Sequence, residues 1–210
     1  MKNSTALINS FFSTNTETDV RVATKEQVEG IGALCFLGCL LLAISSKIQV
    51  PFWPVPMTMQ TFVVFIIGMS YGFSLASYTL IFYLLLGGIG APVFAKGGGL
   101  LYLIGPTAGY LYGMVLAAAV IGYFADKGYA KSYFKSLLAI LLGTILIFAL
   151  GVGYLGYVIG YDKALAGGFY PFIYSETFKI ALAVAVIPTC LLYTSPSPRD
   201  ATLSRMPSSA

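Results

Sequence analysis

The chain has 210 residues, 58% of them hydrophobic and 10% charged, with a formal net charge of +4 and no histidine. A soluble domain carries about 25% charged residues, so the composition favours an integral membrane protein, and the small, dispersed charge argues against nucleic-acid binding. The absence of histidine excludes Ser-His-Asp and Cys-His catalysis and HExxH zinc chemistry, and the three cysteines lie in apolar segments, so we expect no metal site and no cofactor.

Residues 1–29 are predicted to form a polar cytoplasmic leader. The segment from Thr14 to Glu29 carries six charged side chains and lacks the apolar stretch of a signal peptide. At the other end, residues 194–210 change abruptly to serine, proline and arginine. This stretch resembles the read-through of a cloning adaptor, so we interpret it as a non-native tail and leave it out of the fold.

Residues 30–193 are predicted to form the membrane domain, because a spanning helix needs about 20 apolar residues. Only Ser70-Tyr71-Gly72 separates the second and third apolar segments, so five spans is the alternative to six. The predicted fold is an all-α bundle of six transmembrane helices. The six segments are Gly30–Ser46, Met57–Ser70, Phe73–Gly88, Pro106–Phe124, Ser136–Val158 and Phe172–Leu192.

Positively charged residues predict the orientation of the bundle. The leader and the loop between the fourth and fifth spans carry six lysines and arginines, whereas the opposite loops carry Lys47, Lys96 and Lys163. Both termini are therefore expected in the cytoplasm. The proline-rich stretch before the second span, the loop Gly87–Gly105 with its seven glycines and the segment Asp162–Tyr174 then all face outward.

Glu176 and Lys179 are the clear pair of ionisable residues inside a predicted span. Such residues are costly in a bilayer and usually functional, and the i, i+3 spacing places both on one face of a helix. They would offer a ligand a hydrogen-bond acceptor and a donor. The alternative is a stabilising ion pair near the interface, with Lys179 extending to water.

Two further segments contain candidate binding residues. In Pro54-Val55-Pro56-Met57-Thr58-Met59-Gln60-Thr61, the prolines are expected in the first helical turn, which places Thr58 and Gln60 near the outer end of the second span. Gln60 would bind a ligand or form an interhelical hydrogen bond. The glycines of the later loop would let backbone N–H groups approach a ligand, unless the loop is only a tight connection.

Three motifs together resemble the BioY family, the biotin-binding S-components of energy-coupling-factor (ECF) transporters. They are the proline-threonine-glutamine stretch, the turn Gly90-Ala91-Pro92-Val93-Phe94 into the glycine run, and Gly105-Pro106-Thr107-Ala108-Gly109-Tyr110. The acid-x-x-lysine of the last span also fits. The resemblance covers residues 30 to 188 and implies six helices and an outward-facing vitamin site in a prokaryotic plasma membrane, without enzymatic activity.

The family pattern is changed at three positions. The acid of the last helix, usually aspartate, is Glu176 here, and some members have an asparagine and an arginine where this chain has Gly97 and Leu111. Lys96, or the free N–H groups at the start of the helix from Pro106, is therefore expected to hold the carboxylate of the ligand. Biotin has a ureido ring that matches Glu176 and Lys179 and an apolar body. The remaining residues of the expected site are Trp53, Thr58, Gln60, Phe94, Gly97, Gly98, Tyr102 and Tyr110.

The resemblance also implies partners: a transmembrane coupling subunit and two cytoplasmic ATPases. Small residues one turn apart favour helix contact in lipid, and Cys35, Cys39 and Ala43 form such a line, for coupling or for packing within the chain. Three other functions stay open. They are an S-component for a different small vitamin, an intramembrane enzyme that uses Glu176, and a purely structural membrane protein.

Overall fold

Apolar helices dominate the computed structural model, which describes the backbone of residues 17–51 and 53–194 and the side chains of 29–51 and 53–189. Five helical stretches of this part of the chain are long and apolar enough to cross a membrane. They lie in α2 (Glu17–Lys47), α3 (Gln60–Gly88), α5 (Ala108–Asp126), α6 (Tyr133–Ile159) and the pair α7 (Tyr161–Gly168) and α8 (Tyr170–Thr194). The predicted all-α membrane bundle is confirmed.

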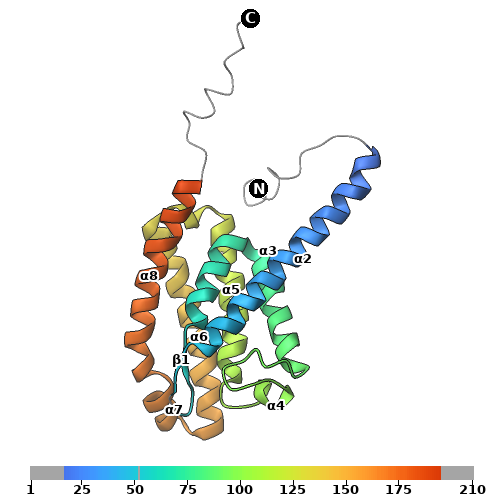
Figure 1. Cartoon of the computed structure of the whole chain (residues 1–210). Coiled ribbons are helices and arrows are strands. Elements are labelled where there is room, and N and C mark those ends of the chain that lie inside the picture. The colour runs from blue at the N-terminus through green and yellow to red at the C-terminus, as the bar shows by residue number, and fades with distance from the viewer. Residues whose placement is uncertain (1–16, 52, 195–210) are drawn as a thin grey trace, which may run out of the picture.

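Helix α3 is folded back on itself at Gly72, where the backbone takes φ 75° and ψ −178°. Gln60 Nε2 donates a hydrogen bond of 2.7 Å to the Tyr83 hydroxyl. In a straight helix these residues would lie about 34 Å apart, because each residue adds about 1.5 Å. The two arms are therefore antiparallel (Figure 1), and the predicted separation of the second and third spans is confirmed.

A side chain from another helix fixes this reversal. Asp126, at the end of α5, accepts a hydrogen bond of 3.1 Å from the Phe73 backbone N–H through Oδ2. A Cβ at Gly72 would collide with the same carboxylate. Only glycine combines the positive φ with the space that Asp126 leaves.

The prediction for the start of the second span is wrong by three residues. Met57–Thr58 form a short strand, β2, that pairs antiparallel with β1 (Gln49–Val50), and the helix begins at Gln60. The prolines lie in the connection between the two strands, not in a helical turn. Pairing with β1 satisfies backbone N–H and C=O groups of β2, so the chain can enter the bundle before the helix starts.

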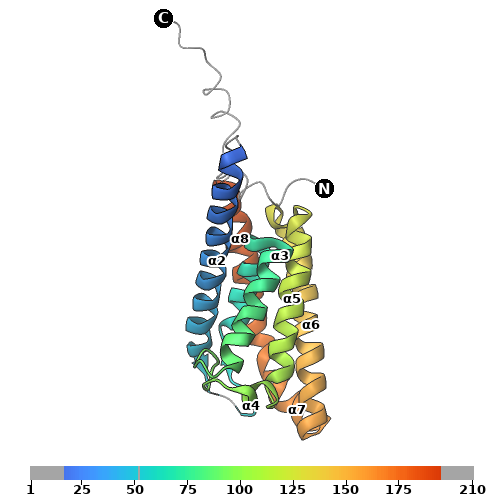
Figure 2. The same ribbon diagram turned by 90° about the vertical axis from the view of Figure 1, so that its right-hand side faces the viewer.

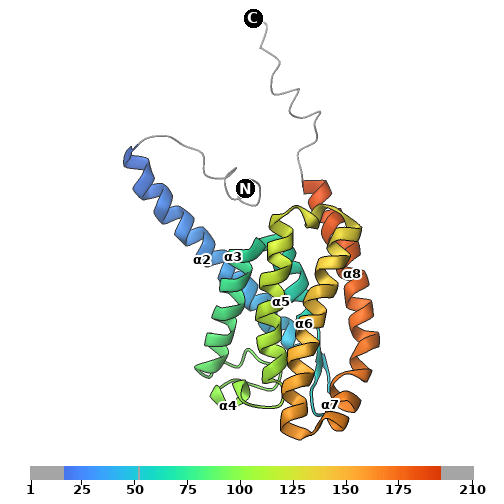
Figure 3. The same cartoon turned by 180° about the vertical axis from the view of Figure 1, so that it is seen from behind.

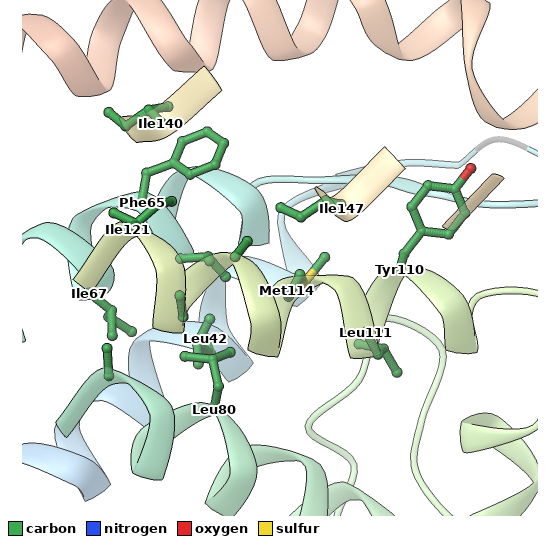
Figure 4. Packing of buried hydrophobic residues seen from close by; sticks show 14 of the residues in the cluster. Leu42, Phe65, Ile67, Leu80, Tyr110, Leu111, Met114, Ile121, Ile140 and Ile147 are labelled. Carbon is green, nitrogen blue, oxygen red and sulfur yellow. The ribbon is translucent and has the colours of Figure 1, made fainter. Parts of the chain in front are cut away.

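Helix α5 lies at the centre of the bundle, between α3 and α6 (Figures 2 and 4). Small residues allow the close approach, since a Cβ at Gly113 would lie only 2.8 Å from Ile147 Cα of α6. Figure 4 shows side chains of α3, α5 and α6 meeting along this helix, with Ile121 near one end and Tyr110 near the other.

The short elements gather at one end of the bundle. The strand pair, α4 (Leu100–Leu103) and α7 lie together there, while the start of α2, the end of α8 and the connection from α5 to α6 lie at the other (Figures 1 and 3). The three segments predicted to converge therefore share one end. The connection from α5 to α6 contains a 3₁₀ turn, Tyr129–Lys131.

The ends of the chain limit two predictions. Helix α2 begins at Glu17, so the helix of the first span extends back into the segment predicted as a leader. Residues 1–16 and the predicted tail from residue 195 onward lie outside the described residues.

The line of small residues on α2, Cys35, Cys39 and Ala43, packs at least partly against α3 of the same chain. Cys39 is buried, and its thiol donates a hydrogen bond of 3.3 Å to the Thr79 carbonyl of α3. At Gly38, a Cβ would lie 2.6 Å from Thr79 Cγ2. Packing within the chain therefore accounts for Cys39.

Candidate ligand-binding site

Glu176 and Lys179 form a buried ion pair on α8. Lys179 Nζ lies 2.7 Å from Glu176 Oε1, and the two residues are 3% and 4% exposed. The burial contradicts the alternative in which Lys179 extends to water. Two charges held this far from water need further polar partners, because desolvation otherwise costs several kcal/mol for each ion.

Those partners come from the end of β2 and the start of α3. Lys179 Nζ donates to the Thr58 carbonyl at 2.6 Å and to Thr61 Oγ1 at 3.1 Å. Thr61 Oγ1 in turn donates to Glu176 Oε1 at 2.9 Å. An ammonium has three N–H donors, so Thr58, Thr61 and Glu176 together use all the donors of Lys179.

Glu176 keeps one oxygen without a partner. Oε2 is buried and accepts no hydrogen bond from any residue that the structure describes. A buried carboxylate oxygen without a donor is costly and therefore uncommon in folded proteins. Because Glu176 lines a cavity, this oxygen is a ready acceptor for a ligand N–H.

Gln60 takes part in a chain of hydrogen bonds beside the ion pair. Its Oε1 accepts a bond of 3.2 Å from Thr58 Oγ1, and its Nε2 donates to the Tyr83 hydroxyl, which donates to the Val93 carbonyl at 2.8 Å. The predicted interhelical bond is thus present, and Gln60 also lines the cavity. An amide carries two N–H donors, so one remains for a ligand.

Side chains near the end of α2 hold the glycine-rich loop over this region. Ser46 Oγ donates to the Val93 carbonyl at 2.8 Å, Lys47 Nζ to the Phe94 carbonyl at 2.7 Å and Gln49 Nε2 to the Ala95 carbonyl at 3.2 Å. Phe94 and Gly97 close the loop by pairing their own backbone groups. The loop is consequently a fixed structure that presents the Phe94 ring inward.

The cavity between these elements is mostly apolar. The space between its lining residues, counted together with the open solvent at its mouth, is about 520 Å³. Phe94 stacks on Tyr102 with ring centroids 4.8 Å apart, and Tyr110 and Phe172 stack at 6.3 Å on the other side. Burial raises the pKa of the Tyr102 hydroxyl above its ordinary value, so this group stays protonated at neutral pH.

The cavity brings together seven of the eleven predicted residues and leaves four outside its lining. The seven are Thr58, Gln60, Phe94, Tyr102, Tyr110, Glu176 and Lys179. Trp53 is 74% exposed in the connection between the strands, and Lys96 is exposed on the loop. Gly97 and Gly98 shape the loop, since Gly97 pairs with Phe94 and a Cβ at Gly98 would collide with the Ala91 carbonyl.

Several lining residues were not predicted from the sequence. Thr61 follows Gln60 directly, and Phe172 lies one helical turn before Glu176, so the 3.6-residue period could have found Phe172. The contribution of α6 had no sequence signal, because its residues belong to a uniformly apolar span. The missed residues are Val55, Pro56, Thr61, Ala95, Thr107, Leu111, Met114, Ile147, Phe148 and Phe172.

The fold and cavity define a membrane-embedded protein that holds a small, mostly apolar molecule by a few polar groups. The sequence model of the BioY family matches residues 15–194. The biotin transporter BioY of Thermotoga maritima is 38% identical over 148 residues, which are 70% of this chain and 86% of that protein. The probable biotin transporter BioY of Pyrococcus horikoshii is 33% identical over 155 residues, which are 73% and 91% of the two chains.

A solved structure has the same fold. The crystal structure of an S-component for biotin from an ECF-type ABC transporter aligns with a TM-score of 0.64 and 22% identity, over 88% of this chain and 97% of that chain. This chain belongs to the BioY family.

Proposed function

We propose that this protein captures biotin in the cavity between α3, α5, α6 and α8 and serves as the substrate-binding subunit of a biotin transporter. The two relatives are named as a biotin transporter and a probable biotin transporter, and the solved neighbour is an S-component for biotin. Members of this family are transporter components rather than enzymes, so the intramembrane enzyme considered from the sequence is set aside.

The unpaired Oε2 of Glu176 carries the proposal. A ureido ring is neutral and offers two N–H donors beside a carbonyl acceptor. One N–H can satisfy Glu176 Oε2, and the ureido carbonyl can accept the remaining N–H of Gln60 Nε2. The aromatic residues of the cavity then cover the apolar sulfur-containing ring.

Equilibrium binding of radiolabelled biotin to the purified protein in detergent, without ATP, tests this function. We expect saturable binding with one site per chain and displacement by unlabelled biotin. A chain that binds no biotin in this assay, while its thermal unfolding remains cooperative, would contradict the proposed function.

Transport needs an energy source beyond this chain. We propose that a transmembrane coupling subunit and two ATPases supply it, as the ECF context of the solved neighbour suggests. Co-expression with such subunits should give ATP-dependent uptake of labelled biotin into proteoliposomes, and vesicles that contain this chain alone serve as the comparison.

The orientation completes the proposal. The strand pair, α4 and α7 would face outward in a prokaryotic plasma membrane, and the connection with Lys127, Lys131 and Lys135 would face the cytoplasm. In a chain without its native cysteines, an impermeant maleimide should label the Lys96→Cys variant in intact cells, but the Lys131→Cys variant only after lysis. The reverse pattern would contradict this orientation.

A further inference from the structure

We infer that the site selects its ligand by a neutral head group that carries an N–H, and that the acidic end of the ligand is left in water at the mouth of the cavity without a cation to bind it. This inference rests on the proposed function and refines it. It differs from the expectation that Lys96 holds the carboxylate of biotin.

Lys179 has no N–H donor left for a ligand among the residues that the structure describes. Its three N–H donors already serve Thr58, Thr61 and Glu176, at distances between 2.6 and 3.1 Å. An ammonium with all donors in use cannot add a strong bond to a carboxylate unless one of these bonds breaks. Its charge is moreover balanced by Glu176. Lys179 therefore orients and neutralises Glu176 and is not an anion receptor.

The rest of the described cavity lining offers no cation. Among the described residues that line the cavity, Glu176 and Lys179 are the charged ones, and the wall formed by α5 presents Tyr110, Leu111 and Met114. Lys47 is exposed, donates to the Phe94 carbonyl at 2.7 Å and does not line the cavity. Lys96 is exposed and does not line the cavity.

A ligand carboxylate is therefore less stable inside the cavity than in water. The ion pair makes the charged part of the lining neutral, so a carboxylate brought inside would be an uncompensated charge among apolar side chains. Such a charge strongly prefers water to an apolar environment. Glu176 Oε2 has the opposite requirement, because it needs a donor. Both demands are met when the head group is inside and the acid is at the mouth.

Competition against labelled biotin tests the inference with three probes: unlabelled biotin, biotinamide, which has a neutral tail, and biotin methylated on its ureido nitrogens. We expect biotinamide to compete within about threefold of biotin and the methylated compound to be weaker by at least about tenfold. Lys96→Ala should leave the ratio between biotin and biotinamide unchanged.

Other results of the competition distinguish a failure of this inference from a failure of the proposed function. If biotin binds but biotinamide is weaker by more than about tenfold, the protein recognises the carboxylate, and the inference is overturned while the proposed function stands. If Lys96→Ala removes that difference, Lys96 is the group that binds the carboxylate. If biotin itself shows no saturable binding, the proposed function fails first.

Discussion

Thr61 and Glu176 are joined by a hydrogen bond of 2.9 Å between residues 115 positions apart in the chain. The same hydroxyl accepts from Lys179, so one threonine of α3 fixes both charged side chains of α8. It also occupies Glu176 Oε1, which leaves Oε2 as the oxygen without a partner. The position of the acceptor for the ligand therefore depends on a residue of a different helix.

Replacing Thr61 by valine should weaken biotin binding. Valine keeps the shape of threonine but removes both hydrogen bonds, so the carboxylate can rotate; we expect a loss of about tenfold, or about 1.4 kcal/mol. Thr61→Ser keeps the hydroxyl and should stay within about threefold of the unmodified chain. Equal affinities of the valine and serine variants, measured with labelled biotin, would show that the hydroxyl is dispensable.

Removing one member of the ion pair should destabilise the fold more than removing both. Lys179→Met leaves Glu176 as an unpaired buried charge, at a cost of about 3–5 kcal/mol. Adding Glu176→Gln removes that charge and should restore much of the thermal unfolding midpoint in detergent, although biotin binding stays weak. An additive double-mutant cycle would contradict the coupling of the two residues.

Gly87 should be required for the aromatic wall of the cavity. A Cβ at Gly87 would collide with the Phe94 ring, which is packed edge-on against Tyr83 at 5.4 Å. Gly87→Ala should displace the ring and reduce biotin affinity about tenfold or more. Gly153→Ala is the matched control, since nothing lies within 4 Å of its Cβ position. Similar losses in both variants would point to a general effect on the fold.

Lys47 should slow the release of biotin. Its bond to the Phe94 carbonyl holds the glycine-rich loop in place, and a hydrogen bond from a charged donor contributes about 1.5–3 kcal/mol. Lys47→Met should therefore raise the dissociation rate of labelled biotin about tenfold or more. Lys163→Met is the control, because it removes an exposed cation at the same end of the protein. An unchanged rate in Lys47→Met would show that the loop is held without this bond.

The sequence determined the features that depend on local pattern. Hydropathy predicted the spans, Ser70-Tyr71-Gly72 predicted the break that the structure places at Gly72, and the i, i+3 spacing placed Glu176 and Lys179 on one face. These features follow from chain length, glycine conformation and helical period, none of which needs information about neighbouring helices.

The tertiary structure decided what each polar side chain contacts. The sequence is compatible with Lys179 as a ligand-binding group. In the structure its N–H donors are used by Thr58 and Thr61, which lie more than a hundred positions earlier in the chain. Trp53 lies outside the cavity because its side chain is exposed in the connection between the strands, and Phe172 lies inside because α8 turns that face inward. In an apolar span every face is compatible with lipid, so the rotation of a helix is set by packing against its neighbours, which local sequence does not specify.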